Sequence, residues 1–264
     1  MGHTRLGTIP KSRKWTAVIA ELGGLEGAVL PGDRKFSEGI AAVARRTLEA
    51  AEVGLDKAAN QRGLQYTFYL LTQLALSARE GDWPQALRRI GIEISESSSV
   101  FDLTVEIQGA VDRHISAFSR PSDVSEMAQG AAGEAITSLA ASEAVTLFGS
   151  GRDDLQRAIR RLSTKKGFSD LGQIFFGRFI ARFVNFYLSR LTAGKLHQVG
   201  EVSSFNQALQ THCEQSARIV RDFCGEWFSK TEFQEGINLD NASRFVAVAV
   251  SKLKSELQRQ RAES

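Results

Sequence analysis

Apolar residues recur at intervals of three and four along most of this chain, which is typical of amphipathic helices. The strongest pattern covers residues 174–191, where the spacing predicts one helix with six aromatic side chains. These aromatic residues are Phe175, Phe176, Phe179, Phe183, Phe186 and Tyr187. The polar side chains at spacings of four, three and four residues are Arg178, Arg182, Asn185 and Ser189. Because they form one narrow stripe, we expect neighbouring helices to cover most of this segment.

The same periodicity predicts helices along the rest of the chain. The longer segments are 40–55, 64–75, 103–118, 124–147, 205–228 and 241–261. Short helices are predicted over 15–22 and from near 82 and 152. Residues 91–95 alternate in polarity, but one isolated strand is more often a loop, and 194–204 is predicted as a loop. The expected fold is therefore all-α: an irregular bundle of about nine helices around a central, buried, Phe-rich helix.

Residue pairs at capping spacing mark where three of these helices begin. Asp82 precedes Trp83-Pro84-Gln85, so its side chain can cap a helix in which proline takes an early position. Ser99 with Asp102, and Asp123 with Glu126, have the same three-residue spacing. These pairs predict helix starts near 82, 99 and 123.

Turn residues and prolines indicate how the chain is organised into domains. Only four prolines occur, and none follows Pro121. Residues 1–14 contain four basic residues and little apolar material, which predicts a basic N-terminal tail. We expect 15–264 to form a single helical domain, and place any boundary between two subdomains near 119–122 or 149–152.

The composition indicates a soluble globular protein. The apolar fraction of 42% and the charged fraction of 24% are near the averages for such proteins, which excludes bulk disorder. Two cysteines argue against a secreted disulfide scaffold. The chain opens with no secretion signal and contains no uncharged apolar run of about 18 residues. We therefore expect a cytoplasmic protein that does not interact with membranes.

The net charge of +3 is unevenly distributed along the chain. Residues 1–35 carry six Lys or Arg against three Asp or Glu, and 151–264 carry eighteen against twelve. Residues 36–150 are acidic, with nine basic against fifteen acidic residues. Basic ends around an acidic middle favour binding of a protein partner or head-to-tail self-association, and they make nucleic acid a second partner class to test.

The only grouping of cysteine and histidine gives no metal site. Cys213 and Cys224 are eleven residues apart, which on one continuous helix is about 16 Å and too far for one metal ion or a disulfide. Both lie on an apolar stripe with Val220 and Phe228, so we expect buried, reduced thiols. His114 follows the apolar spacing of 103–118 and is interpreted as a core or edge residue.

Glycine-rich segments do not match nucleotide-binding motifs. Gly149-Ser150-Gly151 precedes Arg152-Asp153-Asp154, whereas a phosphate loop closes with Gly-Lys-Ser/Thr. Two acidic residues in a first helical turn suit the helix dipole and would repel phosphate. The chain also contains no nucleophile elbow and no zinc-protease motif. We therefore expect no cofactor, no metal and no recognisable catalytic residues.

The basic clusters are the one feature that indicates a binding site. The residues we expect to contact an anionic partner are Arg5, Lys11, Arg13, Lys14, Arg157, Arg160, Arg161, Lys165 and Lys166. Clustered like charges cost stability unless an anion relieves them. The alternative is a solvated helix face on which Asp153 and Asp154 pair with Arg157.

Three functional hypotheses follow. The first is a non-enzymatic helical interaction protein that is a subunit or adaptor of a larger cytoplasmic assembly. One form of this hypothesis associates the assembly with nucleic acid. The second is direct, non-specific binding of nucleic acid through the basic clusters, since no recognition-helix or RNA-binding aromatic motif is present. The third is an enzyme whose scattered acidic and arginine residues form a site that the sequence does not reveal.

Overall fold

The computed structural model describes residues 12–25, 34–118, 120–141, 151–192, 199–234 and 236–259. Within these ranges the chain forms twelve helices and no strand, which confirms the all-α prediction and corrects the predicted number of about nine. The helices are α1 (Arg13–Gly23), α2 (Arg34–Ala50), α3 (Glu52–Ala59), α4 (Arg62–Ser77), α5 (Trp83–Arg89), α6 (Val100–Phe118), α7 (Asp123–Ala141), α8 (Arg152–Leu162), α9 (Lys165–Thr192), α10 (Val199–Ser216), α11 (Arg218–Gln234) and α12 (Leu239–Arg259).

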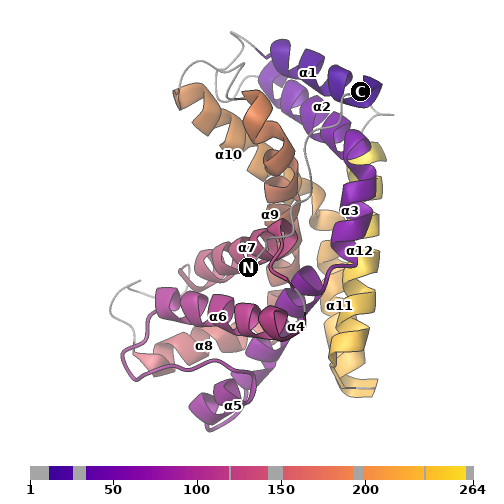
Figure 1. Ribbon diagram of the computed structural model, residues 1–264. Coiled ribbons are helices and arrows are strands. Elements are labelled where there is room, and N and C mark those ends of the chain that lie inside the picture. Colours follow the sequence, from indigo (N-terminus) through magenta and orange to yellow (C-terminus); the bar gives the residue numbers. More distant parts are fainter. Residues whose placement is uncertain are drawn as a thin grey trace.

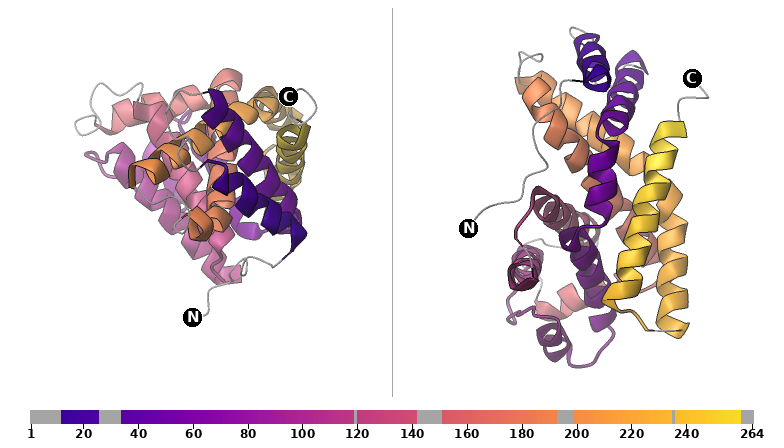
Figure 2. Two further views of the ribbon diagram at one scale, coloured as in Figure 1. Left: turned by 90° about the horizontal axis from the view of Figure 1, so that it is seen from above. Right: turned by 45° about the vertical axis from the view of Figure 1, so that its right-hand side comes forward.

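Helix α9 is the central element of the molecule (Figure 1). It packs mainly against α11, α7 and α10, and makes smaller contacts with α8 and α2. Helices α1 and α2 lie together at one end, and α5, α6 and α8 lie at the other (Figures 1 and 2). Helix α12 runs beside α11 and also contacts α4 and α3, so it covers the side of the core away from α7.

The aromatic side chains of α9 form the middle of the core, as the sequence predicts. Phe175, Phe176, Phe179 and Phe183 are fully buried. The Phe176 ring lies 5.3 Å from the ring of Phe68 on α4. Burying a phenylalanine side chain contributes about 1.5–3 kcal/mol relative to leaving it exposed, so this helix contributes strongly to stability.

The polar stripe of α9 meets acidic residues on two neighbouring helices. Arg178 Nη1 donates to Glu134 of α7 at 3.1 Å, and its Nε lies 2.9 Å from Glu214 of α10. Arg182 also pairs with Glu134. The stripe is therefore the line along which α7 and α10 meet the central helix.

Two segments predicted as single helices are each divided in two, which explains much of the difference in number. The segment 40–55 breaks at Ala51, and 205–228 breaks at Ala217. A hydroxyl in the preceding turn bonds a carbonyl four residues back in both cases: Thr47 to Val43 at 2.8 Å, and Ser216 to His212 at 2.9 Å. Such bonds compete with the helical ladder and are associated with bends.

Three other predictions of local structure need correction. The predicted loop 194–204 is helical from Val199 onwards, because α10 begins there. The cap of α7 is Ser122, whose hydroxyl accepts from Ser125 N–H at 3.2 Å, so it lies one residue earlier than predicted. Residues 13 and 14, which we predicted as part of the tail, belong to α1, while residues 1–11 lie outside the described residues.

The other two predicted caps are confirmed. Asp82 Oδ1 accepts the Gln85 N–H at 3.1 Å, and Pro84 occupies an early position of α5. Asp102 Oδ2 accepts the Ser99 N–H at 2.7 Å, while Ser99 Oγ accepts the Asp102 N–H at 3.2 Å. All three hydrogen bonds satisfy backbone donors that a helix start leaves open.

Candidate functional site

The predicted basic residues do not all come together in space. Arg5 and Lys11 lie outside the described residues. Arg13 and Lys14 open α1, where Lys14 Nζ donates to the carbonyl of Glu49 at 3.0 Å. Since α1 lies at the end of the molecule opposite α8, these two residues are remote from the second cluster (Figures 1 and 2).

The second cluster occupies the exposed face of α8 and the first turn of α9. Helix α8 is strongly amphipathic. The residues on its buried face are Leu155, Ala158, Ile159 and Leu162. The exposed basic residues of this cluster are Arg157, Arg160, Arg161, Lys165 and Lys166, which we call the basic surface. Lys165 and Lys166 belong to α9 itself, so one long helix carries both the central core and part of this surface.

A side chain of α8 and one from the segment that follows α4 hold the basic surface in place. Gln156 Nε2 donates to the carbonyls of Ala78 at 3.2 Å and Glu80 at 2.9 Å, which ties α8 to the end of α4. Arg79 donates to the carbonyl of Ser163, between α8 and α9, and also pairs with Glu232 of α11. The turn that joins the two halves of the basic surface is thereby fixed to the core.

Local ion pairs neutralise only part of the basic surface. Arg157 pairs with Asp154. In the described part of the chain, no acidic side chain lies within ion-pair distance of Arg160, Lys165 or Lys166. Basic residues in the last turn of α8 suit the dipole of that helix. Lysines in the first turn of α9 do not suit the dipole of their own helix. The N-terminus of a helix is already positive, and this turn contains no acidic residue.

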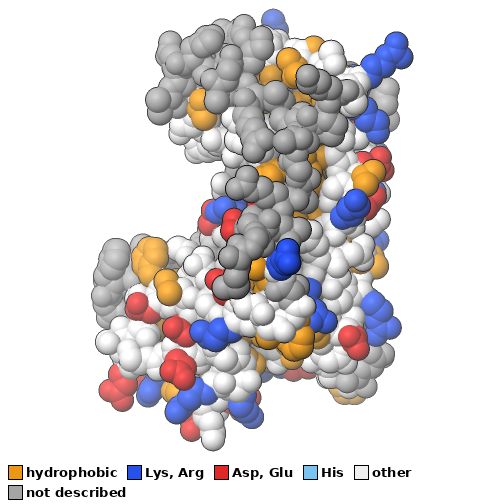
Figure 3. Space-filling model, in the orientation of Figure 1, with side chains coloured by type: hydrophobic (Ala, Val, Ile, Leu, Met, Phe, Trp, Pro, Cys, Tyr) orange, Lys and Arg blue, Asp and Glu red, His pale blue; other side chains and the backbone are white. Residues whose placement is uncertain are grey.

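The space-filling view shows charged side chains of both signs at the end of the molecule that carries α5 and α8 (Figure 3). Pairs such as Arg89 with Glu80 contribute to this mixture. Surface pairs of this kind contribute about 0–1 kcal/mol each. Their main effect is to limit the positive field outside the basic surface.

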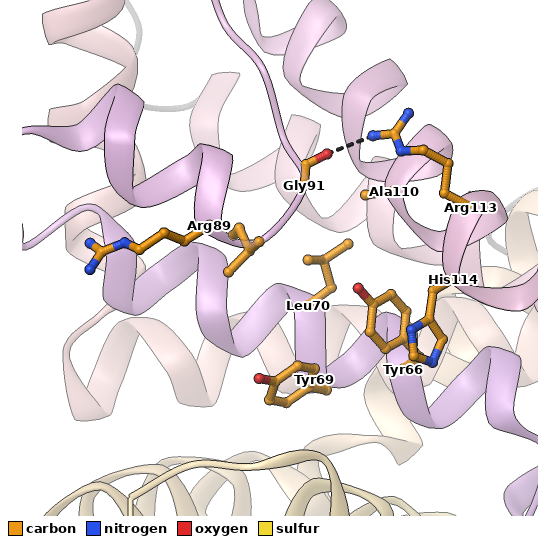
Figure 4. Close-up of a pocket in the computed structure, with 9 residues that line it drawn as sticks. Tyr66, Tyr69, Leu70, Arg89, Gly91, Ala110, Arg113 and His114 are labelled. Atoms are coloured by element: carbon orange, nitrogen blue, oxygen red, sulfur yellow. Dashed lines mark hydrogen bonds between the residues drawn. The ribbon is translucent and has the colours of Figure 1, made fainter. Parts of the chain in front are cut away.

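A cavity that the sequence analysis did not predict lies between α4, the end of α5 and α6 (Figure 4). Its volume is about 360 Å³. The residues that line it are Tyr66, Tyr69, Leu70, Arg89, Ile90, Gly91, Ala110, Arg113 and His114. His114, which we interpreted as a core or edge residue of a helix, lies on α6 as predicted. Its side chain lines this cavity.

Gly91 turns the chain at the edge of this cavity. It follows α5 with a φ of +79°, a conformation that glycine adopts without strain. The Ile92 N–H donates to the Leu87 carbonyl at 3.0 Å, which closes the helix end. The Gly91 carbonyl then accepts from Arg113 Nη2 at 2.6 Å and links the end of α5 to α6.

Burial shifts the pKa of three side chains on the wall of the cavity. Burial raises the pKa of Tyr66 and Tyr69, and their mutual proximity raises that of Tyr66 further. Burial and the nearby charge of Arg62 lower the pKa of His114 below its ordinary value. The cavity therefore presents protonated phenols and a neutral imidazole at neutral pH.

The two cysteines are buried free thiols, as expected, but on different helices. Cys213 lies on α10 and Cys224 on α11. Burial raises the pKa of Cys213 to about 12 and also raises the pKa of Cys224, which makes both poor nucleophiles. Among the described residues, no group of three or more His, Cys, Asp or Glu could hold a metal ion.

No described helix combines the length and apolar character needed to cross a membrane. Comparison with known proteins found no matching family model, no similar curated protein and no similar solved structure.

Proposed function

We propose that this protein is a non-enzymatic interaction protein, a subunit or adaptor that holds an anionic partner on its basic surface. The observation that supports the proposal is that the basic surface combines a fixed backbone with cationic side chains that lack acidic partners. Its backbone is fixed to the core, but Arg160, Lys165 and Lys166 have no acidic partner in the described chain. A rigid array of unneutralised cations is suited to a partner with repeated negative charge.

The first turn of α9 strengthens this argument. Lys165 and Lys166 add positive charge where the dipole of a 28-residue helix is already positive. An anion placed there gains from both sources, and relieves repulsion that the free protein has to tolerate. Nucleic acid and an acidic protein surface, including that of a second copy, both have the required charge.

The test reverses charge at the basic surface and at a matched control site. The first variant combines Arg157→Glu, Arg160→Glu and Arg161→Glu. The control combines Lys230→Glu, Arg244→Glu and Lys252→Glu, which are exposed positions on α11 and α12 and give the same change in net charge. Binding to mixed-sequence DNA and RNA is measured by fluorescence anisotropy, and partners from cell extract are compared by affinity capture.

We expect the first variant to lose binding while its helical circular dichroism is unchanged, and the control to keep most of it. Loss of nucleic-acid affinity would make nucleic acid the partner. Loss of a captured protein alone, or of a self-associated species in sedimentation, would assign the surface to a protein contact. Equal behaviour of both variants toward every partner would contradict the proposal.

A further inference from the structure

The cavity between α4, α5 and α6 has the dimensions of a ligand site. Its volume of about 360 Å³ lies in the range of roughly 300–1,000 Å³ that is typical of small-molecule pockets. Such pockets combine apolar walls with a small number of polar groups that orient the ligand. Leu70, Ile90 and Ala110 provide apolar lining here, and no acidic side chain of the described chain lines the cavity.

Arg113 supplies the positive charge. Its side chain is 61% exposed, so a ligand can reach it from solvent. One of its amino groups is held by the Gly91 carbonyl at 2.6 Å, which orients the guanidinium (Figure 4). Glu106 lies at 4.0 Å, the outer limit of an ion pair. A guanidinium has five N–H donors, so several remain for an anion.

Two phenol groups add neutral hydrogen-bond donors. Tyr66 and Tyr69 both line the cavity from α4. Neither hydroxyl has a hydrogen-bond partner in the part of the chain that the structure describes. A phenol that burial keeps protonated can donate to an oxygen anion, and the raised pKa of both side chains agrees with that state.

One wall of the cavity is flat and rigid. The rings of Tyr66 and His114 are stacked, with centroids 3.5 Å apart and planes at 2° (Figure 4). The Phe118 ring lies beside His114 at 4.9 Å, tilted by 47°, and Arg62 covers the Phe118 ring at 4.8 Å. His114 Nε2 is buried and has no described partner, which is consistent with a ring held by stacking. Stacked side chains lose little freedom when a planar ligand packs beside them.

We propose that this cavity binds a small aromatic anion, a molecule in which a planar ring carries a phosphate or carboxylate group. The anion lies at Arg113 and accepts from the Tyr66 hydroxyl, while the ring packs on the apolar lining and the phenol rings. The proposal is independent of the basic surface, because none of the residues that line the cavity belongs to that surface.

Calorimetric titration of the full chain with three probes tests this site. Phenyl phosphate and benzoate carry both ring and anion, whereas inorganic phosphate carries the anion alone. We expect at least one aromatic probe to bind more tightly than inorganic phosphate. Preference for phenyl phosphate or for benzoate then distinguishes a phosphate ligand from a carboxylate ligand.

Three variants locate the binding. Tyr66→Phe keeps the stacked ring and removes one donor, so affinity should fall about fivefold. Arg113→Gln removes the charge, so affinity should fall about tenfold or more. Arg88→Gln is the matched control, because Arg88 lies on α5, does not line the cavity and is exposed; it should change affinity less than twofold.

Two results would overturn the proposal. One is that neither aromatic probe binds at millimolar concentration. The other is that wild type, Tyr66→Phe and Arg88→Gln bind with equal affinity, which would mean that the probe binds elsewhere. Tyr66→Phe decides the outcome even if Arg113→Gln disturbs the contact with Gly91, since the conservative change leaves that contact in place.

Discussion

Neighbouring residues of α9 have very different surroundings. Phe179 and Phe183 are fully buried, whereas the side chains of Arg178 and Arg182 are 17% and 41% exposed. Arg178 lies between Glu134 and Glu214, so removing it would leave Glu214 without its ion-pair partner and Glu134 with Arg182 alone. Arg182 shares only Glu134 and has solvent on one side.

These different surroundings predict that removing the Phe179 side chain destabilises the protein more than removing the Arg182 side chain. Phe179→Ala should lower the free energy of unfolding by about 3–5 kcal/mol, because it removes buried apolar area and leaves a cavity. Arg182→Ala should cost about 1 kcal/mol or less, as for other solvent-exposed ion pairs. Urea unfolding followed by circular dichroism measures both. If Arg182→Ala costs more than Phe179→Ala, the orientation assigned to α9 is wrong.

Periodicity alone separates these residues, because burial in a helix depends on which face a side chain occupies. The sequence therefore predicts that the phenylalanines are buried and that the arginines form a stripe. It does not predict the partners of the stripe. Glu134 and Glu214 lie on other helices, far from Arg178 in the chain, and no local pattern connects them.

At the scale of elements, close approach between α9 and α11 depends on Gly172. A Cβ added there would lie 2.3 Å from Cys224 Sγ and 2.7 Å from its Cβ. Neither helix can move freely, since α9 also packs against α7 and α10. The two helices can approach this closely only because residue 172 has no side chain.

We expect Gly172→Ala to destabilise the protein by about 1–3 kcal/mol from overpacking, despite the better helix propensity of alanine. Adding Cys224→Ala removes the Sγ contact and should recover part of that loss. A double-mutant cycle in urea measures the coupling between the two positions. Additive effects of the two changes would show that the helices do not meet at this point.

Helix breaks are the part of the fold that the sequence predicts least well. Both missed breaks occur at alanine, which is the best helix former. Neither Ala51 nor Ala217 is accompanied by glycine or proline, so propensity favours a continuous helix there. The hydroxyls of Thr47 and Ser216 give the only local signal, and they bend a helix only when tertiary packing agrees.

At the scale of the whole molecule, two histidines in separate cavities make the free energy of unfolding depend on pH in the same direction. His114 lines the cavity described above, and His212 lines a second cavity of about 310 Å³ between α2 and α10. Burial lowers the pKa of both histidines, and the charge of Arg62 adds to this effect at His114. Folding therefore favours the neutral imidazoles.

The unfolded chain consequently binds more protons than the native protein near pH 6. The histidine contribution to stability is complete above the ordinary pKa of about 6.5, and it is lost as the pH falls toward the lower native values. The double variant His114→Gln, His212→Gln should show a smaller loss of unfolding free energy between about pH 7.5 and about pH 5.5. A loss equal to that of wild type would contradict the assigned burial.

Contacts between remote segments also explain why the cavity escaped prediction. It joins Tyr66, Gly91 and Arg113 from three elements, and none of them belongs to a binding motif in the sequence. The amphipathic pattern of residues 152–162, in contrast, predicts the basic face of α8 because the neighbouring positions of one helix suffice. The sequence does not predict that α1 lies at the end of the molecule opposite α8, because that arrangement depends on the whole fold.

The salt dependence of nucleic-acid binding tests the basic surface most directly. If the surface contacts phosphates, log affinity of the wild type should fall linearly with log salt, with a slope of about −0.9 for each phosphate neutralised on duplex DNA. Charge reversal at Arg157, Arg160 and Arg161 should make that slope shallower by an amount that corresponds to several lost phosphate contacts. Charge reversal on α11 and α12 should leave the slope nearly unchanged. Measurable binding whose slope is the same in all three proteins would contradict the role proposed for this surface.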